Sequence, residues 1–279
     1  MEPREAVDRQ VRFGMARLAP GPYRPTSWLL TVDGALQSCV DLADPTYLHL
    51  PYATWAARVL DLHWPAGQPV TAVQVGGGGF TIARYLAATR PGSPQTVYEL
   101  DGPLVDLVRS HLELDSIADL RVRVEDGERG IARTPDAAAD VVVVDVFRAG
   151  AVTAHLAAVE FLREIARVLR PGGLYLGNTW SAADMTLPLR AVASLAEVFP
   201  HVVLLAEPGL LLGRQAGNAV LAASDRELPH GALTEWARSA GDRVFCLSAA
   251  QLAAFRGVAP PLTAEHPAGP VTPVPHCAL

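Results

Sequence analysis

Hydrophobic and polar positions divide the chain into short apolar runs that end at a glycine or a carboxylate. The clearest run, Ala72–Val75, leads directly into Gly76–Gly79. Three further runs end at Glu99, Asp126 and Asp145. Helical spacing between the runs predicts parallel strands joined by right-handed helical crossovers. The tips of such strands meet at the carboxyl edge of the sheet, where ligands bind.

The pattern as a whole predicts an α/β protein with about seven strands in this sheet, the final pair antiparallel. Strands are expected over residues 72–75, 96–99, 121–124, 140–144, 174–178, 201–206 and 218–223. Helices are expected over residues 81–89, 103–112, 159–169 and 187–198.

The first 65 residues follow a different pattern. Strand-like runs over 11–15, 27–32 and 35–40, with an Asp33-Gly34 hairpin turn between the last two, predict a small antiparallel sheet. A helix is expected next, over 52–62. We therefore divide the chain into an N-terminal β-hairpin domain (1–65), an α/β domain (66–258) and a Pro-rich, loosely ordered C-terminal tail (259–279).

Composition excludes several classes of protein. All 23 basic residues are arginine, which rules out a pyridoxal-phosphate Schiff base and a P-loop lysine. The net charge of −6 argues against nucleic acid as a partner. The absence of a long apolar run or a signal peptide predicts a cytoplasmic protein with no membrane contact. Cys39, Cys246 and Cys277 lack metal-type spacing, so we expect reduced thiols and no metal site; His49 and His155 show no ligand or triad spacing.

The glycine run and the acids at the strand tips together predict a nucleoside site. Gly76–Gly79 is either a plain strand-to-helix turn or a close approach of the backbone to a ligand. Glu99 follows the glycine run at the distance in sequence where a carboxylate accepts hydrogen bonds from ribose hydroxyls. Dinucleotide sites and S-adenosylmethionine (AdoMet) sites share this pattern. Asp126 could accept a hydrogen bond from the adenine amino group, or Asp126-Gly127 could be a simple turn. Asp145 leaves a buried valine strand, where an idle ionised carboxylate would be costly.

These motifs, in this order, resemble the spermidine synthase (polyamine aminopropyltransferase) family over roughly residues 28–225. The resemblance is carried by Asp33-Gly34 with Gln37, Gly76-Gly77-Gly78, Glu99-Leu100-Asp101, Asp126-Gly127, Asp145 and Leu169-Arg170-Pro171-Gly172-Gly173. It implies a Rossmann-like, methyltransferase-type domain that binds AdoMet or decarboxylated AdoMet, and commonly a homodimer. The family pattern assigns the ribose to Gln37 and Glu99, the adenine edge to Asp126 and the attacking amine to Asp145. Tyr52 would correspond to a tyrosine on the substrate side.

The sequence departs from the family in the half of the site that would hold the reacting groups. Gly79-Phe80-Thr81 replaces the usual Asp-Gly-Gly, and Arg148 stands three positions after Asp145 where the family has a second aspartate. These changes predict weaker polyamine binding and a place for the carboxylate of intact AdoMet. Arg148 could pair with that carboxylate, or could be an exposed loop arginine. Trp180 lines an acceptor pocket or belongs to the core.

The first functional hypothesis is therefore a transferase that uses AdoMet and a small-molecule substrate. The group moved would be methyl, aminopropyl or 3-amino-3-carboxypropyl, or AdoMet would cyclise or eliminate with release of methylthioadenosine. Alternatives are a polyamine aminopropyltransferase that uses decarboxylated AdoMet, and a non-catalytic nucleoside-binding relative. A dinucleotide oxidoreductase is disfavoured by the four-glycine run and by Asp126.

Overall fold

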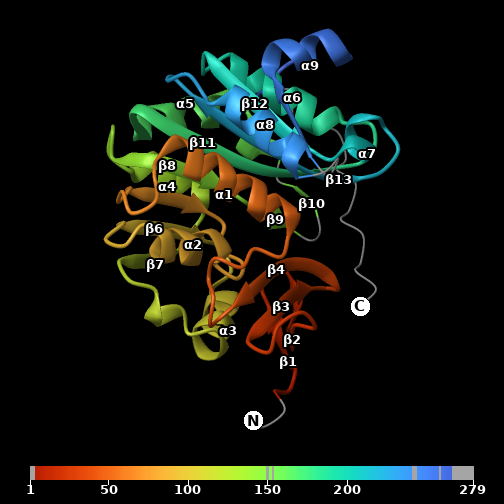
Figure 1. Cartoon of the computed structure of the whole chain (residues 1–279). Helices are drawn as coiled ribbons and strands as arrows, with labels where there is room; N and C mark the ends of the chain where they lie inside the picture. The colour runs from red at the N-terminus through yellow and green to blue at the C-terminus, as the bar shows by residue number, and fades with distance from the viewer. Residues whose placement is uncertain (1–3, 149–150, 153, 241–243, 258, 266–279) are drawn as a thin grey trace.

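The described residues form a four-stranded N-terminal sheet, an eight-stranded sheet and a small two-stranded sheet. In Figure 1 the N-terminal sheet lies at the bottom, below the eight-stranded sheet. The structure, a computed structural model, describes residues 4–148, 151–152, 154–240, 244–257 and 259–265. The expected α/β class with a separate N-terminal antiparallel sheet is confirmed.

The N-terminal sheet is a meander of four antiparallel strands. They are β1 (Val7–Val11), β2 (Gly14–Pro20), β3 (Ser27–Val32) and β4 (Ala35–Asp41). Asp33 and Gly34 both have positive φ, 47° and 78°, as a tight hairpin turn requires. The prediction of a strand over residues 11–15 is wrong, because the chain reverses direction at Arg12-Phe13 between β1 and β2. The Arg12 amide donates to Asp101 of the larger domain, a contact that local alternation does not reveal.

The larger sheet has eight strands in the order β14-β12-β13-β11-β8-β5-β6-β7. They span Ala72–Val75 (β5), Gln95–Glu99 (β6), Leu120–Val124 (β7), Ala139–Val144 (β8), Leu169–Ser181 (β11), His201–Ala206 (β12), Gly217–Ser224 (β13) and Phe245–Ser248 (β14). The neighbours from β7 to β11 pair in parallel, whereas β13 is antiparallel to both β11 and β12. Sequence patterning missed β14, a four-residue edge strand paired only with β12. It also missed the two-residue strands β9 (Phe147–Arg148) and β10 (Ala151–Val152).

Helices cover both faces of this sheet (Figure 1). They are α1 (Pro51–His63), α2 (Thr81–Thr89), α3 (Gly102–His111), α4 (Gly127–Arg133), α5 (Val159–Val168), α6 (Thr186–Ala196), α7 (Pro208–Leu211), α8 (His230–Ser239) and α9 (Ala249–Arg256). Helix α2 matches its predicted bounds, and α3, α5 and α6 differ from theirs by one or two residues. The sequence pattern did not predict α4, α7, α8 or α9.

The N-terminal sheet shares a hydrophobic core with the larger domain. Leu18 and Leu30 of the small sheet belong to the same buried cluster as Phe80 and Leu107. Burial of this shared apolar surface fixes the small sheet against α2 and α3. As a result, β4 lies beside the glycine loop that precedes α2.

The start of the expected C-terminal tail packs against the domain. Leu262 is fully buried. Its amide donates to Ser194 Oγ at 2.8 Å, and its carbonyl oxygen accepts from the Val159 amide at 2.9 Å. Residues 259–265 are therefore part of the folded domain, contrary to the expectation of loose order, and residues 266–279 lie outside the described range.

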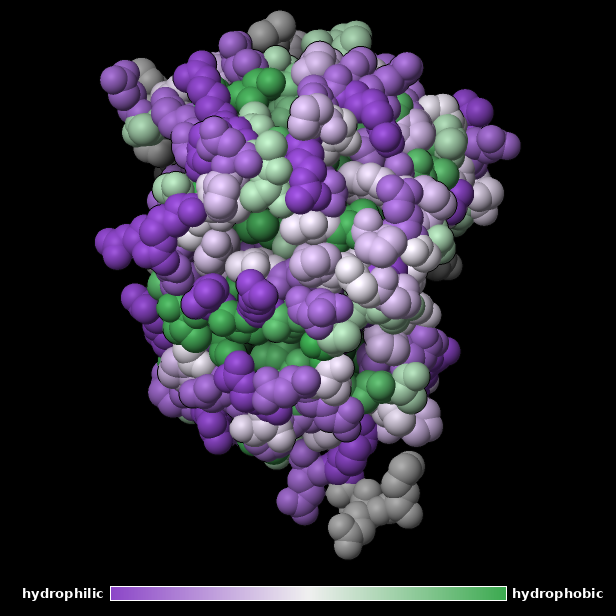
Figure 2. All heavy atoms as spheres, turned by 90° about the vertical axis from the view of Figure 1, so that its left-hand side faces the viewer, coloured by the Kyte–Doolittle hydropathy of each residue, from purple (hydrophilic) through white to green (hydrophobic). Residues whose placement is uncertain are grey.

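Hydrophilic side chains cover most of the face shown in Figure 2, and a recessed hydrophobic band lies between them. Among the described residues, none of the helices has the length and apolar character needed to cross a membrane.

Candidate AdoMet-type site

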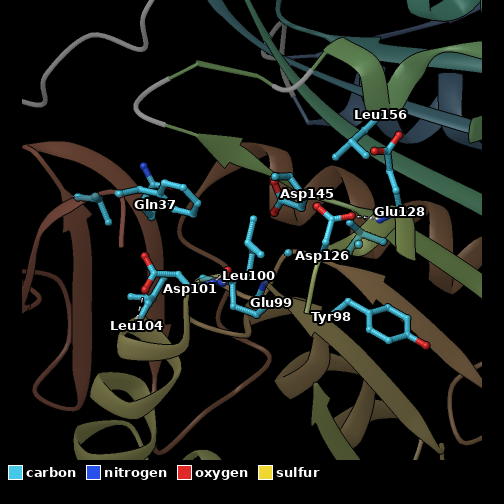
Figure 3. A pocket seen from close by; sticks show the side chains of 18 of the residues that line it. Gln37, Tyr98, Glu99, Leu100, Asp101, Leu104, Asp126, Glu128, Asp145 and Leu156 are labelled. Carbon is cyan, nitrogen blue, oxygen red and sulfur yellow. Dashed lines mark hydrogen bonds between the residues drawn. The ribbon is translucent and has the colours of Figure 1, made fainter. Parts of the chain in front are cut away.

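A pocket lies at the carboxyl edge of the parallel strands, where the N-terminal sheet closes over it (Figure 3). Eight of the eleven predicted site residues line it: Gln37, Gly76, Gly77, Gly78, Glu99, Asp126, Gly127 and Asp145. The described lining also includes residues that sequence reasoning did not select, among them Phe13, Ser38, Leu100, Asp101, Glu128, His155 and Leu156. His155, which shows no ligand or triad spacing in the sequence, thus lies on the pocket wall.

The glycine loop is shaped by its neighbours in the fold. Gly76 has φ +91°, and a Cβ there would lie 2.1 Å from the carbonyl oxygen of Asp145. Only glycine allows the loop to pass this close to the end of β8. Phe80 occupies the left-handed region (φ 59°) although it is not glycine, and its ring is buried in the core shared with the N-terminal sheet. Burial of a phenylalanine ring, at about 2–3 kcal/mol, outweighs a left-handed cost of about 1–2 kcal/mol.

Gly79 is held from two sides. Its amide donates to Ser38 Oγ on β4 at 2.9 Å, and its carbonyl oxygen accepts from Arg84 Nε on α2 at 3.0 Å. A Cβ at position 79 would lie 2.7 Å from Ser38 Cβ. The N-terminal sheet therefore occupies the space that any side chain at position 79 would need.

Glu99 bridges the end of β6 and the glycine loop. Its Oε2 accepts from the Gly77 amide at 2.7 Å, and its Oε1 accepts from the Asp101 amide at 2.9 Å. Burial raises the pKa of Glu99 above its ordinary value, although these backbone donors act in the opposite direction. The carboxylate is thus fixed on the pocket wall beside the glycine loop.

Asp126 and Gly127 begin α4, and both have structural roles. Asp126 Oδ1 caps the helix by accepting from the Glu128 and Arg129 amides. Its Oδ2 accepts no hydrogen bond from the described residues. A Cβ on Gly127 would lie 2.2 Å from Val75 Cγ1, so glycine allows α4 to pack closely on β5.

Asp145 lies at the end of β8 and is the centre of a small polar network. Asn178 Nδ2 of β11 donates to Asp145 Oδ1 at 3.0 Å. The Tyr52 hydroxyl of α1 donates to the Gln37 carbonyl oxygen at 3.4 Å, and its interaction with the Asp145 carboxylate lowers the pKa of that group. Burial raises the pKa of Asp145 to about 6, against the lowering effect of the two donors. Such a carboxylate can exchange a proton near neutral pH.

The three predicted substrate residues occupy different places. Tyr52 contacts Asp145 although it is outside the pocket lining. Trp180 packs against the core cluster that contains Met185 and Leu210 and does not line the pocket. The backbone of Arg148 lies in β9, and its side chain lies outside the described part of the structure.

Comparisons with known proteins first define the class. Residues 73–177 match the methyltransferase domain family. The structure of human methyltransferase-like protein 13 in complex with SAH has the same fold, at a TM-score of 0.52 and 20% identity over 67% of this chain and 86% of that one. The chain therefore has the fold of the class I AdoMet-dependent methyltransferases.

Closer similarity comes from spermidine synthases. A probable spermidine synthase from Corynebacterium glutamicum aligns over 97% of this chain and 99% of its own, with a TM-score of 0.85 and 28% identity. Spermidine synthase from Thermotoga maritima aligns over 83% of this chain and 77% of its own, with a TM-score of 0.61 and 18% identity. The polyamine aminopropyltransferase of Chromobacterium violaceum is 26% identical over 146 residues, which span 52% of this chain and 55% of that protein.

The chain is a spermidine-synthase-like protein with a class I methyltransferase fold, as the motif resemblance implied. The same matches support an AdoMet-dependent transferase. The alignment with the Chromobacterium violaceum protein covers only about half of either chain.

Proposed function

We propose that the protein transfers a carbon group from an AdoMet-type sulfonium to an amine, with Asp145 as the base. The amine nitrogen would attack a carbon bound to sulfur, and the C–S bonding pair would leave with the sulfur. The proton lost by the amine would pass to the Asp145 carboxylate. The observation that carries the proposal is Asp145 itself, which lies half-buried on the pocket wall, accepts a hydrogen bond from Asn178, and has its pKa raised to about 6.

The wall of the pocket supports a cationic, adenosine-bearing donor. Glu99, with Gln37 nearby, offers groups for the ribose hydroxyls, and Asp126 Oδ2 offers an acceptor for the adenine amino group. The described lining contains five carboxylates and neither arginine nor lysine: Glu99, Asp101, Asp126, Glu128 and Asp145. This charge favours a sulfonium and disfavours the pyrophosphate of a dinucleotide.

Intact AdoMet is our preferred donor, because packing against Ser38 leaves no room for an acid at position 79. Without that acid, the site has one negative charge fewer to repel the carboxylate that AdoMet carries and the decarboxylated donor lacks. The second candidate is aminopropyl transfer from decarboxylated AdoMet to a polyamine, which the names of the spermidine synthase relatives favour. Mass spectrometry of products after incubation with each donor, with and without putrescine, separates the two. Methylthioadenosine formed from AdoMet alone would instead indicate cyclisation or elimination.

The donor preference predicts the behaviour of two substitutions at the contact between Ser38 and Gly79. Gly79→Asp alone is expected to destabilise the protein and weaken AdoMet binding, since its Cβ would meet Ser38 Cβ at 2.7 Å. Adding Ser38→Gly removes that clash and leaves Val40 Cγ1, at 3.2 Å, as the tightest remaining neighbour of the new Cβ. The double variant is expected to shift the ratio of Kd values towards decarboxylated AdoMet by about tenfold, through the new carboxylate. Calorimetry with both donors measures the ratio, and Ser38→Gly alone is the control. An unchanged ratio in a folded double variant would contradict the preference.

The rate is also expected to depend on pH through Asp145. The base must be ionised, and its pKa is raised to about 6, so kcat should fall about tenfold per pH unit below that value. Above it, the carboxylate is fully ionised and the rate should level off. A kcat profile from pH 4.5 to 8.5 tests this; a rate that stays constant down to pH 4.5 would rule out a base with a raised pKa.

We also propose that the protein is a homodimer, as the resemblance implies. Light scattering of the purified protein should then give twice the mass of one chain.

A further inference from the structure

Asp145 is oriented through a chain of two asparagines. Asn218 Nδ2 of β13 donates to Asn178 Oδ1 at 3.0 Å, and Asn178 Nδ2 in turn donates to Asp145 Oδ1 at 3.0 Å. In the antiparallel pair of β11 and β13, Asn178 lies opposite Val220, and Trp180 lies opposite Asn218. Asn178 and Asn218 are therefore diagonal neighbours on one face of the sheet.

The direction of this chain matters because an amide has two different ends. Asn178 can present either its NH₂ group, a donor, or its Oδ1, an acceptor, to Asp145. The donor stabilises an ionised carboxylate, whereas the acceptor stabilises the protonated acid. Asn178 is only 8% exposed, so water is a poor substitute for a missing partner.

We propose that Asn218 is a positioning residue, which fixes the orientation of Asn178 so that the amide donates to Asp145 and keeps it available as a base. Because Asn218 Nδ2 occupies Asn178 Oδ1, only the NH₂ end of Asn178 remains to face Asp145. Asn218 has no direct contact with Asp145 and acts through Asn178. The kinetic consequence rests on the proposed function, but the orientation of the amide does not.

Other groups near Asp145 set the background for its titration. Tyr52 faces it from α1, and the facing groups of β11 and β13 are the neutral amides of Asn178 and Asn218. The remaining titratable groups on the described pocket wall are Tyr98, Glu99, Asp101, Asp126, Glu128 and His155. None of these changes in the variants below, so a shift in the Asp145 titration reports on the asparagine chain.

The test is the pKa of Asp145 in the ligand-free full-length protein, followed by NMR of ¹³C-labelled aspartate carboxyls and assigned with Asp145→Asn. Asn178→Leu removes the donor and sets the upper limit of the shift. Asn218→Leu, which has a similar shape but no amide, is expected to raise the pKa of Asp145 by about one unit. Asn218→Ala is a second variant in case leucine disturbs packing. Thr179→Val is the matched control, because Thr179 contacts Ala219 on the same two strands and should leave the titration unchanged.

The proposal would be overturned if the pKa of Asp145 in a folded Asn218 variant equals the wild-type value while the pKa in Asn178→Leu is shifted. The proposed function is judged separately by product formation in the wild-type protein. If the wild-type protein is active, the acid limb of kcat should move with the NMR pKa in Asn218→Leu. A fall in kcat with no movement of that limb would indicate a purely structural role and would also contradict the proposal.

Discussion

Replacement of Asp145 with asparagine is expected to lower kcat by about 10³-fold while the affinity for AdoMet changes by less than about threefold. General base catalysis contributes factors of about 10² to 10⁴, and asparagine cannot accept the proton of the amine. Adenosine binding should persist, because Glu99 and Asp126 lie on other strand tips. Product formation by mass spectrometry gives the rate, and calorimetry gives the affinity.

Stability separates this result from a general loss of structure. The folded-state pKa of Asp145 lies above its ordinary value of 3.8, so ionisation reduces stability as pH rises from about 4 to about 6, and the full cost applies above that. Asp145→Asn is therefore expected to keep or raise Tm at pH 7.5. Asp115→Asn is the control, because Asp115 is an exposed acid that pairs with Arg109 and does not line the pocket. Full activity of Asp145→Asn would show that Asp145 is not the general base.

Replacement of Gly76 with alanine is expected to have the largest effect on stability, a loss of about 4 kcal/mol or more in the free energy of unfolding. The new Cβ would lie 2.1 Å from the Asp145 carbonyl oxygen, a backbone atom that cannot rotate away. The loop would have to shift, and AdoMet binding should be lost with it. Urea unfolding measures the first effect, and calorimetry measures the second.

Gly67 provides a matched control for the cost of placing alanine at a positive φ. It has a similar φ, +82°, but a Cβ there would meet nothing within 4 Å. Gly67→Ala should therefore cost only the left-handed penalty of about 1–2 kcal/mol. Equal losses in the two variants would show that close approach to β8 is not the reason for glycine at position 76.

Much of the fold was predictable because its signals are local. Short apolar runs identified seven of the eight strands in the main sheet, and the Asp33-Gly34 pair identified a turn whose positive φ angles the structure confirms. What local pattern could not show was β14, whose four residues find a partner only in β12. It likewise misplaced the turn at Arg12, which is fixed by an acceptor 89 positions away.

The same division holds for the site. The sequence by itself determined which acids and glycines would meet at one edge, because the carboxyl tips of parallel strands converge in any such sheet. Tertiary structure alone decided how they are held: Ser38 against Gly79, and Asn178 and Tyr52 around Asp145. These contacts join β4 and α1, near the start of the chain, and β11, near residue 178, to the glycine loop and the end of β8, which are far from them in sequence. Their chemistry depends on packing and amide orientation, which no spacing of residues along one strand encodes.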